Sequence, residues 1–123
     1  MNNTPAAIAA ILCFDPTDAA FALLWAEHVP GALWTCYIDT TDDGAEYITV
    51  EACSGLNVVG WHVLPAANRG VTATMNAWDG RAPTLYPSIR SFLQSVHPLS
   101  TDALADVEAM IVTRSMGGTF GQR

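Results

Sequence analysis

The sequence contains no lysine, and none of its five cationic side chains, all arginines, comes before Arg69. The first 68 residues carry eight carboxylates, which gives this half a formal charge of −8, whereas the remainder stands at +1. Binding to a nucleic-acid backbone needs clustered cations, so we expect no direct binding to nucleic acid. The charge instead favours a protein partner with a basic surface, or simply serves solubility.

Long apolar runs are also missing. The longest, Ala6–Phe14 and Ala19–Ala26, fall far short of the about 20 residues that cross a bilayer, and no cation precedes the first, so we expect neither a membrane span nor a signal peptide. The three cysteines, Cys13, Cys36 and Cys53, are odd in number and widely spaced, which supports neither a disulfide framework nor a CxxC zinc site. We therefore expect a cytoplasmic protein with at least two of these thiols buried as small hydrophobic side chains.

No motif for a metal or a cofactor is present. The three histidines, His28, His62 and His97, lie far apart along the chain and show no ligand spacing. The glycine-rich stretch Gly117–Gly121 lacks the lysine of a phosphate-binding loop. We therefore expect no metal and no cofactor.

The composition predicts one domain over residues 1–123, because 123 residues with 50% apolar content suffice for one core. Asp15 and Pro16 are a helix start signal, and the apolar spacing that follows predicts a helix over 16–28. For residues 5–13 a short helix and a buried strand remain alternatives. Further predicted segments are a short helix over Ser88–Val96, a final helix capped by Ser100 with Leu104, Val107 and Ile111 on one face, and a loose tail over 117–123.

The middle of the chain has the two-residue period of strands. Leu33–Asp39, Glu46–Cys53 and Asn57–Leu64 are rich in aromatic and β-branched residues and are separated by turn sequences. A loop at 42–44 with a left-handed Gly44, and a turn at Ser54-Gly55, place the same apolar residues on one face. The predicted pairs are Ile38 with Ile48, Cys36 with Val50 and Trp34 with Ala52, then Val50 with Val59 and Ile48 with Trp61.

These segments predict an α+β fold, an antiparallel meander of three or four strands with helices packed on one face. Val71–Met75 is the candidate fourth strand, and Pro83–Pro87 is an extended segment fixed by its prolines. The opposite face of the sheet carries the row Asp39–Tyr47–His62. An imidazole beside acidic groups is a candidate acid or base, and the alternative is a solvated face with ordinary polar pairs.

Two short segments resemble known families. Cys53-Ser54-Gly55-Leu56 resembles the nucleophile motif of the NlpC-type cell-wall cysteine peptidases, which implies Cys53 as a nucleophile with a histidine such as His62; the alternative is a turn between strands. Residues 78–89 resemble a Trp-x-Gly…Pro-Thr-x-x-Pro-Ser-Ile segment of small uncharacterised phage and prophage proteins, which implies provenance and not activity. Trp78, beside a turn, is expected to be partly exposed and to serve as a binding anchor.

Three hypotheses about function follow. The first is a small acidic inhibitor that occupies a basic surface of a partner protein, for example an anti-CRISPR-type protein or a toxin antagonist. The second is the cysteine hydrolase, and the third is a phage structural protein that self-associates. The first requires the acidic side chains of the first half to converge on one exposed patch; its candidate binding residues are Asp39, Asp42, Asp43, Glu46, Glu51 and Trp78.

Overall fold

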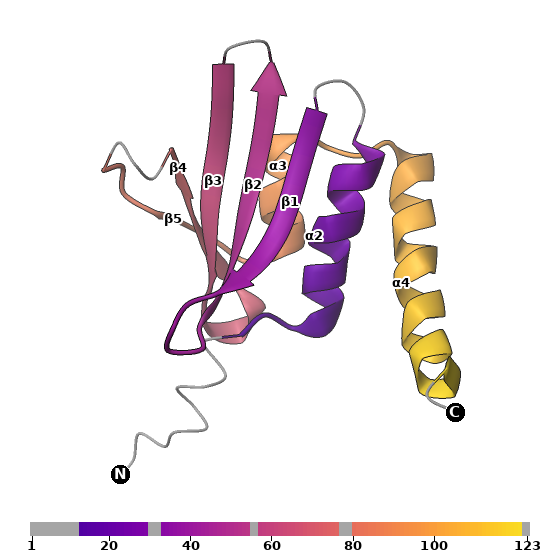
Figure 1. Ribbon diagram of the computed structural model, residues 1–123. Helices are drawn as coiled ribbons and strands as arrows, with labels where there is room; N and C mark the ends of the chain where they lie inside the picture. The colour runs from indigo at the N-terminus through magenta and orange to yellow at the C-terminus, as the bar shows by residue number, and fades with distance from the viewer. Residues whose placement is uncertain (1–12, 30–32, 55–56, 77–79, 122–123) are drawn as a thin grey trace.

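Five antiparallel strands in the order β1-β2-β3-β4-β5 form one sheet, and the helices cover one of its faces (Figure 1). The computed structural model describes residues 13–29, 33–54, 57–76 and 80–121. The predicted α+β fold is confirmed, with one or two strands more than expected. The elements are α2 (Pro16–His28), β1 (Leu33–Thr40), β2 (Glu46–Ser54), β3 (Asn57–Pro65), the 3-10 helix η1 (Ala67–Arg69), β4 (Val71–Met75), β5 (Thr84–Tyr86), α3 (Ile89–Val96) and α4 (Thr101–Gly121).

The helices begin where the sequence predicts. The Asp15 carboxylate accepts a hydrogen bond from the Thr17 N–H at 2.9 Å and caps α2, and Ser88 and Ser91 form a capping box at the start of α3. Helix α4 continues to Gly121, so the loose tail predicted from Gly117 is wrong as far as Gly121. Within the described ranges, no helix is both long and apolar enough to span a bilayer. The question of helix or strand over residues 5–13 concerns residues outside the described part, apart from Cys13.

The register of the first hairpin is as predicted, and that of the second is not. β1 and β2 pair Ile38 with Ile48 and Cys36 with Val50. Between β2 and β3, however, Val50 lies opposite Trp61 rather than Val59, and the hairpin closes with the pair Ser54 and Asn57. The shift is two residues, which keeps every side chain on its predicted face, so the apolar pattern cannot distinguish the two registers.

The extended segment predicted between the two prolines is an edge strand. β5 pairs with β4 and brings Tyr86 opposite Val71. The connection before β4 is tightly packed, because a Cβ at Gly70 would lie 3.1 Å from the carbonyl oxygens of both Ala67 and Tyr86. Asn68 and Arg69, just before it, both have left-handed backbone angles, at φ 59° and 62°. This connection directs the Arg69 side chain back towards α2.

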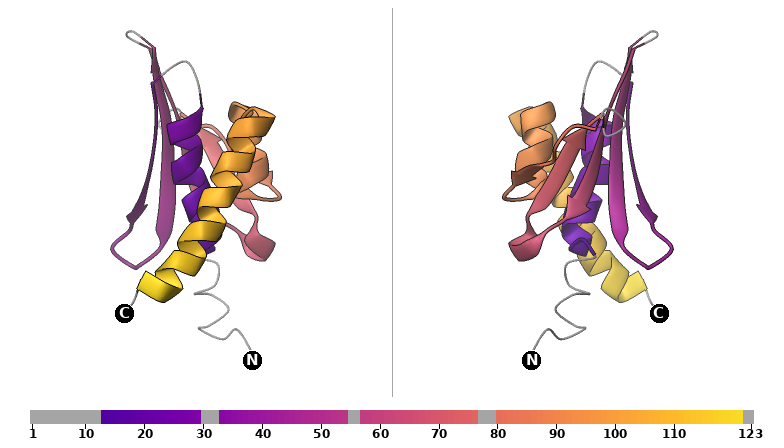
Figure 2. Two further views of the ribbon diagram at one scale, coloured as in Figure 1. Left: turned by 90° about the vertical axis from the view of Figure 1, so that its right-hand side faces the viewer. Right: turned by 90° about the vertical axis from the view of Figure 1, so that its left-hand side faces the viewer.

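The core lies between the sheet and the helices, which Figure 2 shows on one side of the strands. Trp25 is fully buried, and its Nε1 donates to the His97 carbonyl at 3.0 Å. Its ring meets Trp34 edge-on, and Trp34 stacks with Trp61 on the inner face of the sheet. Other large buried side chains are Phe21, Leu24, Ile48, Val50, Val63, Val71, Ile89, Phe92, Leu93 and Val107.

The prediction that at least two cysteines are buried is wrong. Cys13 and Cys53 are exposed, and only Cys36 is partly buried. Cys53 falls on the outer face of β2, which no described helix covers, whereas Cys36 lies on the helical side of β1, opposite the buried Val50. Burial raises the pKa of the Cys36 thiol to about 12.

Candidate binding surface

No element of the described residues covers the face of the sheet opposite the helices. Helices α2 and α3 and most of α4 lie on the other side of the strands (Figure 2). Several large side chains on the uncovered side are exposed, including Tyr37 at 46%, Leu64 at 41% and Leu85 at 70%. We call this side the open sheet face and define it by Thr35, Tyr37, Asp39, Tyr47, Thr49, Glu51, Cys53, His62, Leu64, Thr72, Thr74 and Leu85.

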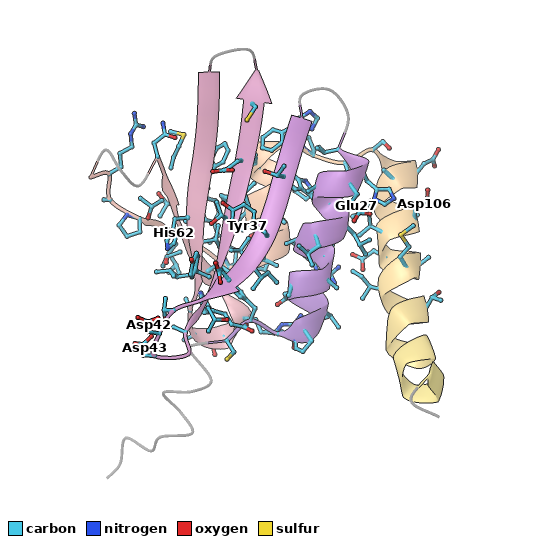
Figure 3. The ribbon with its side chains drawn as sticks, viewed as in Figure 1. Glu27, Tyr37, Asp42, Asp43, His62 and Asp106 are labelled. Carbon is cyan, nitrogen blue, oxygen red and sulfur yellow. The ribbon has the colours of Figure 1, made fainter. Side chains whose placement is uncertain are left out.

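Aromatic rings form the centre of the open sheet face. The Tyr47 and His62 ring centroids are 4.8 Å apart, and Tyr37 is on the neighbouring strand (Figure 3). The predicted row Asp39–Tyr47–His62 is wrong at its third member, because the two-residue shift places His62 opposite Thr49. His62 therefore stacks on Tyr47 diagonally and does not lie in a row with a carboxylate. Desolvation and then the charge and hydrogen bond of Asp39 raise the pKa of Tyr47 above its usual value.

The loop between β1 and β2 places carboxylates at one end of this face. Gly44 has φ +89°, as the turn predicts, and its N–H donates to the Thr41 carbonyl at 2.9 Å. Asp42 and Asp43 are exposed in this loop, and the Thr41 hydroxyl donates to Asp43 and lowers the pKa of that carboxyl. We call Asp42 and Asp43, which are labelled in Figure 3, together with Asp39 near the end of β1 the acidic tip.

The two glutamates predicted to belong to the same patch have other surroundings. The Glu46 carboxylate accepts a hydrogen bond from the Phe14 N–H at 2.9 Å and so ties the chain before α2 to the sheet. Glu51 is half-buried on the open sheet face, between Thr35 on β1 and Gly60 on β3. Glu46 thus has a structural contact, and Glu51 lies four residues along β2 from Tyr47.

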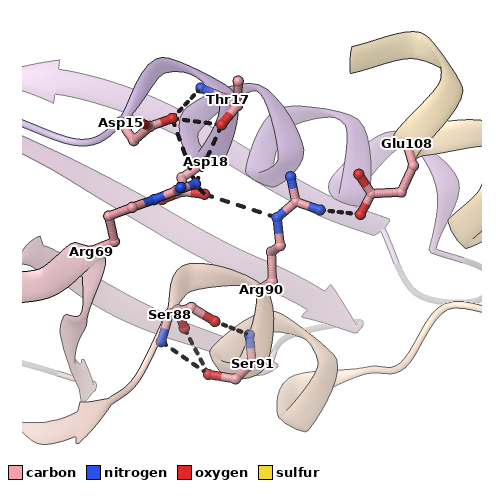
Figure 4. A network of polar contacts seen from close by, with 8 residues as sticks. All are labelled: Asp15, Thr17, Asp18, Arg69, Ser88, Arg90, Ser91 and Glu108. Atoms are coloured by element: carbon pink, nitrogen blue, oxygen red, sulfur yellow. Dashed lines mark hydrogen bonds and ion pairs between the residues drawn. The ribbon is translucent and has the colours of Figure 1, made fainter. Parts of the chain in front are cut away.

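Arginines neutralise two of the eight carboxylates. Asp18, 5% exposed, accepts two hydrogen bonds from Arg69, at 2.6 and 3.0 Å, and lies 3.9 Å from the Arg90 guanidinium (Figure 4). Arg90 in turn pairs with Glu108 on α4, and Arg69 lies 3.7 Å from Asp15. The hydrogen bonds of Thr17 hold the pKa of Asp15 below its usual value, and Asp18 raises that of Arg69.

The eight carboxylates of the first half therefore do not converge on a single patch, and that prediction is wrong. Asp15 and Asp18 belong to the arginine network, and Glu27 lies on α2, in the helical layer with Asp106 of α4 (Figure 3). What remains on the open side of the sheet is the acidic tip with Glu51. Sequence reasoning missed the network because Arg69 lies 51 residues from Asp18, and no local pattern links them.

The structure does not assemble the proposed cysteine–histidine pair. Cys53 lies on a strand, opposite Val58, and not at the start of a helix as in the family that its tetrapeptide resembles. Its cross-strand pair is four pairs away from that of His62, which separates the two side chains by about 13 Å along the strands. Trp78, the proposed anchor, lies outside the described residues.

Thiol labelling provides a direct check on the cysteines. With iodoacetamide at about pH 8 in native buffer, we expect Cys13 and Cys53 to react at the rate of a free thiol, since both are exposed. Cys36, with a pKa of about 12, should react only after unfolding. Peptide mass spectrometry measures each rate. If Cys53 reacted much faster than glutathione, the result would support the cysteine hydrolase hypothesis.

Two cavities lie on other parts of the surface. One of about 630 Å³ is lined by Cys13, Phe14 and Arg69, and one of about 420 Å³ by Trp61, Tyr86 and Arg81. Neither contains a residue of the open sheet face or of the acidic tip. In the part of the chain that the structure describes, no three histidine, cysteine or acidic side chains are grouped to hold a metal ion.

The described part of the chain thus presents a sheet face without a covering element, which carries aromatic and aliphatic side chains, and a carboxylate cluster at one end of that face. Comparisons of the chain with protein-family models, curated proteins and solved structures find no match.

Proposed function

We propose that this protein binds another protein that has a basic surface, using the open sheet face and the acidic tip together. The observation that carries the proposal is the composition of this side of the molecule. It combines exposed Tyr37, Leu64 and Leu85 with the carboxylates of Asp39, Asp42 and Asp43, and no residue of either set is an arginine.

The two parts of the surface have different roles in binding. Aromatic side chains such as Tyr37 and Tyr47 provide large contact areas at low entropic cost and are enriched where interfaces gain most of their affinity. Each exposed carboxylate contributes modestly to affinity, but three together accelerate encounter with a basic partner, which strengthens binding, and they disfavour acidic partners. The sheet face would therefore hold the partner, and the acidic tip would guide it.

A binding protein of this kind acts stoichiometrically, by occupying a surface that its partner needs. Basic surfaces of proteins commonly serve to bind nucleic acid, so carboxylates in place of phosphates make an inhibitor of a nucleic-acid-binding protein the specific form of the proposal. The likeness of residues 78–89 to phage segments is consistent with an anti-CRISPR-type inhibitor or a toxin antagonist in the bacterial cytoplasm.

The test compares two variants with the same loss of charge. Asp39→Asn with Asp42→Asn and Asp43→Asn neutralises the acidic tip, whereas Glu27→Gln with Asp102→Asn and Asp106→Asn neutralises three exposed carboxylates on the helices. Each tagged protein is incubated with bacterial lysate at about 0.05 M and about 0.5 M salt, and retained proteins are quantified by mass spectrometry.

We expect a defined protein to be retained by the wild type and the helix variant, and to be reduced about tenfold or more for the tip variant and at high salt. Retention of the same proteins by all three forms, independent of salt, would show the proposal to be wrong.

A further inference from the structure

The two edges of the sheet differ in how they are protected. β5 has three residues and is flanked by Pro83 and Pro87, which have no N–H to offer a further strand. β1 has eight residues, from Leu33 to Thr40, and contains neither proline nor lysine. Only the β1 edge is thus long enough, and rich enough in backbone donors, to pair with another strand.

The hydrogen bonds of the hairpin identify which backbone groups of β1 face outward. Thr41 N–H donates to the Ala45 carbonyl at 2.8 Å, and bonded pairs alternate along an antiparallel ladder, so Tyr37 and Asp39 bond to β2. The N–H groups of Trp34, Cys36, Ile38 and Thr40 consequently point to the free edge. The Asp39 carboxylate accepts from the Thr40 N–H at 2.8 Å; within the described residues, nothing accepts from the other three.

The surroundings of this edge are acidic. Asp39 belongs to β1 itself, and Asp42 and Asp43 follow in the loop at its end. A second copy of this chain would bring the same carboxylates and a further charge of −7 to the contact, whereas a basic segment would be attracted.

We propose that an extended, basic segment of the partner pairs with β1 as a sixth strand. The proposal rests on the proposed function and specifies how the partner is held. Because side chains alternate along a strand, residues of the segment beside Trp34, Cys36 and Ile38 face the helical layer and are apolar. The intervening residues face the open side with Tyr37 and Asp39, and these carry the positive charges.

The test uses two synthetic nine-residue peptides with alternating arginine and valine, acetylated at the N-terminus. The second peptide has the same side chains but N-methylated peptide bonds, so it keeps the charge and cannot donate to a strand. Nuclear magnetic resonance of the full chain measures binding and the exchange rate of each β1 amide hydrogen.

In the free protein, we expect slow exchange at Tyr37 and Asp39 and fast exchange at Cys36 and Ile38. The unmodified peptide should slow exchange at Cys36 and Ile38 at least tenfold. The N-methylated peptide should bind with an affinity that is lower by a factor of about ten or more. Equal binding of the two peptides, or unchanged exchange at Cys36 and Ile38 at saturation, would overturn the proposal.

A protein variant gives an independent measurement. Cys36→Pro removes one outward N–H that β2 does not use, and it should weaken binding of the unmodified peptide several-fold, whereas Cys36→Ala should not. If Cys36→Pro does not fold, the amide exchange rates of the wild type with the two peptides still show whether β1 pairs with the peptide.

The two proposals fail separately. If the acidic-tip variant loses its partner but the peptides bind equally, strand pairing is wrong and the proposed function stands. If the tip variant retains the same proteins as the wild type, the proposed function is wrong, whatever the peptides do.

Discussion

Replacing Phe92 with alanine is expected to lower the free energy of unfolding by about 3–5 kcal/mol. Phe92 is fully buried on α3, and its ring meets Tyr86 of β5 at 5.0 Å and Trp61 of β3 at 6.2 Å between centroids, both edge-on. The substitution removes the ring that joins the short helix to the sheet and leaves a cavity that these aromatic neighbours cannot fill.

Urea unfolding followed by tryptophan fluorescence measures this loss. Leu85→Ala is the matched control, because Leu85 is also apolar but 70% exposed on β5, and its removal should change stability by less than about 0.5 kcal/mol. A loss below about 1 kcal/mol for Phe92→Ala would contradict the packing of α3 described above.

The second large effect is expected at Asp18. Asp18→Asn removes the charge that pairs with Arg69 and with the half-buried Arg90, and it should lower the free energy of unfolding by about 2–3 kcal/mol at neutral pH. We expect less than the 3–5 kcal/mol typical of a broken buried pair, because more than half of the Arg69 side chain is exposed and water screens that part of the interaction.

Glu108→Gln provides the comparison within the same network. Glu108 pairs with Arg90 but is 43% exposed, so its loss should cost less than about 1 kcal/mol. Thermal unfolding by circular dichroism ranks the variants; equal stability of Asp18→Asn and the wild type would show that the network contributes nothing net.

The parts of the fold that local chemistry specifies were predictable from the sequence. Asp15 and Pro16 start a helix by capping and by a fixed backbone angle, and the loop at 42–44 sets the register of β1 on β2 through one left-handed glycine. In both cases the determining residues are adjacent in the chain. The acidic tip followed from the same loop.

Interactions between distant residues were not predictable. The turn of the second hairpin lies one residue later than predicted, which shifts the pairing of β2 with β3 by two residues. Both registers place the same apolar side chains on the inner face, so the sequence pattern could not distinguish them. The pairing of Asp18 with Arg69 depends on the path of the chain through η1, which no pattern of residue types encodes. The sequence predicted which residues share the outer face of the sheet. It did not predict that the described residues leave this face uncovered, because that depends on where the helices pack.

The Arg69 contact also has a consequence for the order in which the chain acquires its structure during synthesis. Helix α2 is the first described element to leave the ribosome, yet the guanidinium that satisfies its buried carboxylate is translated 51 residues later, and the α3 side chains that cover its core face later still. Until then, the nascent helix exposes Phe21, Leu24 and Trp25 together with an unpaired Asp18. The buried side chains of α2 therefore gain their partners only after most of the chain has emerged. Truncated products are expected to depend on chaperones.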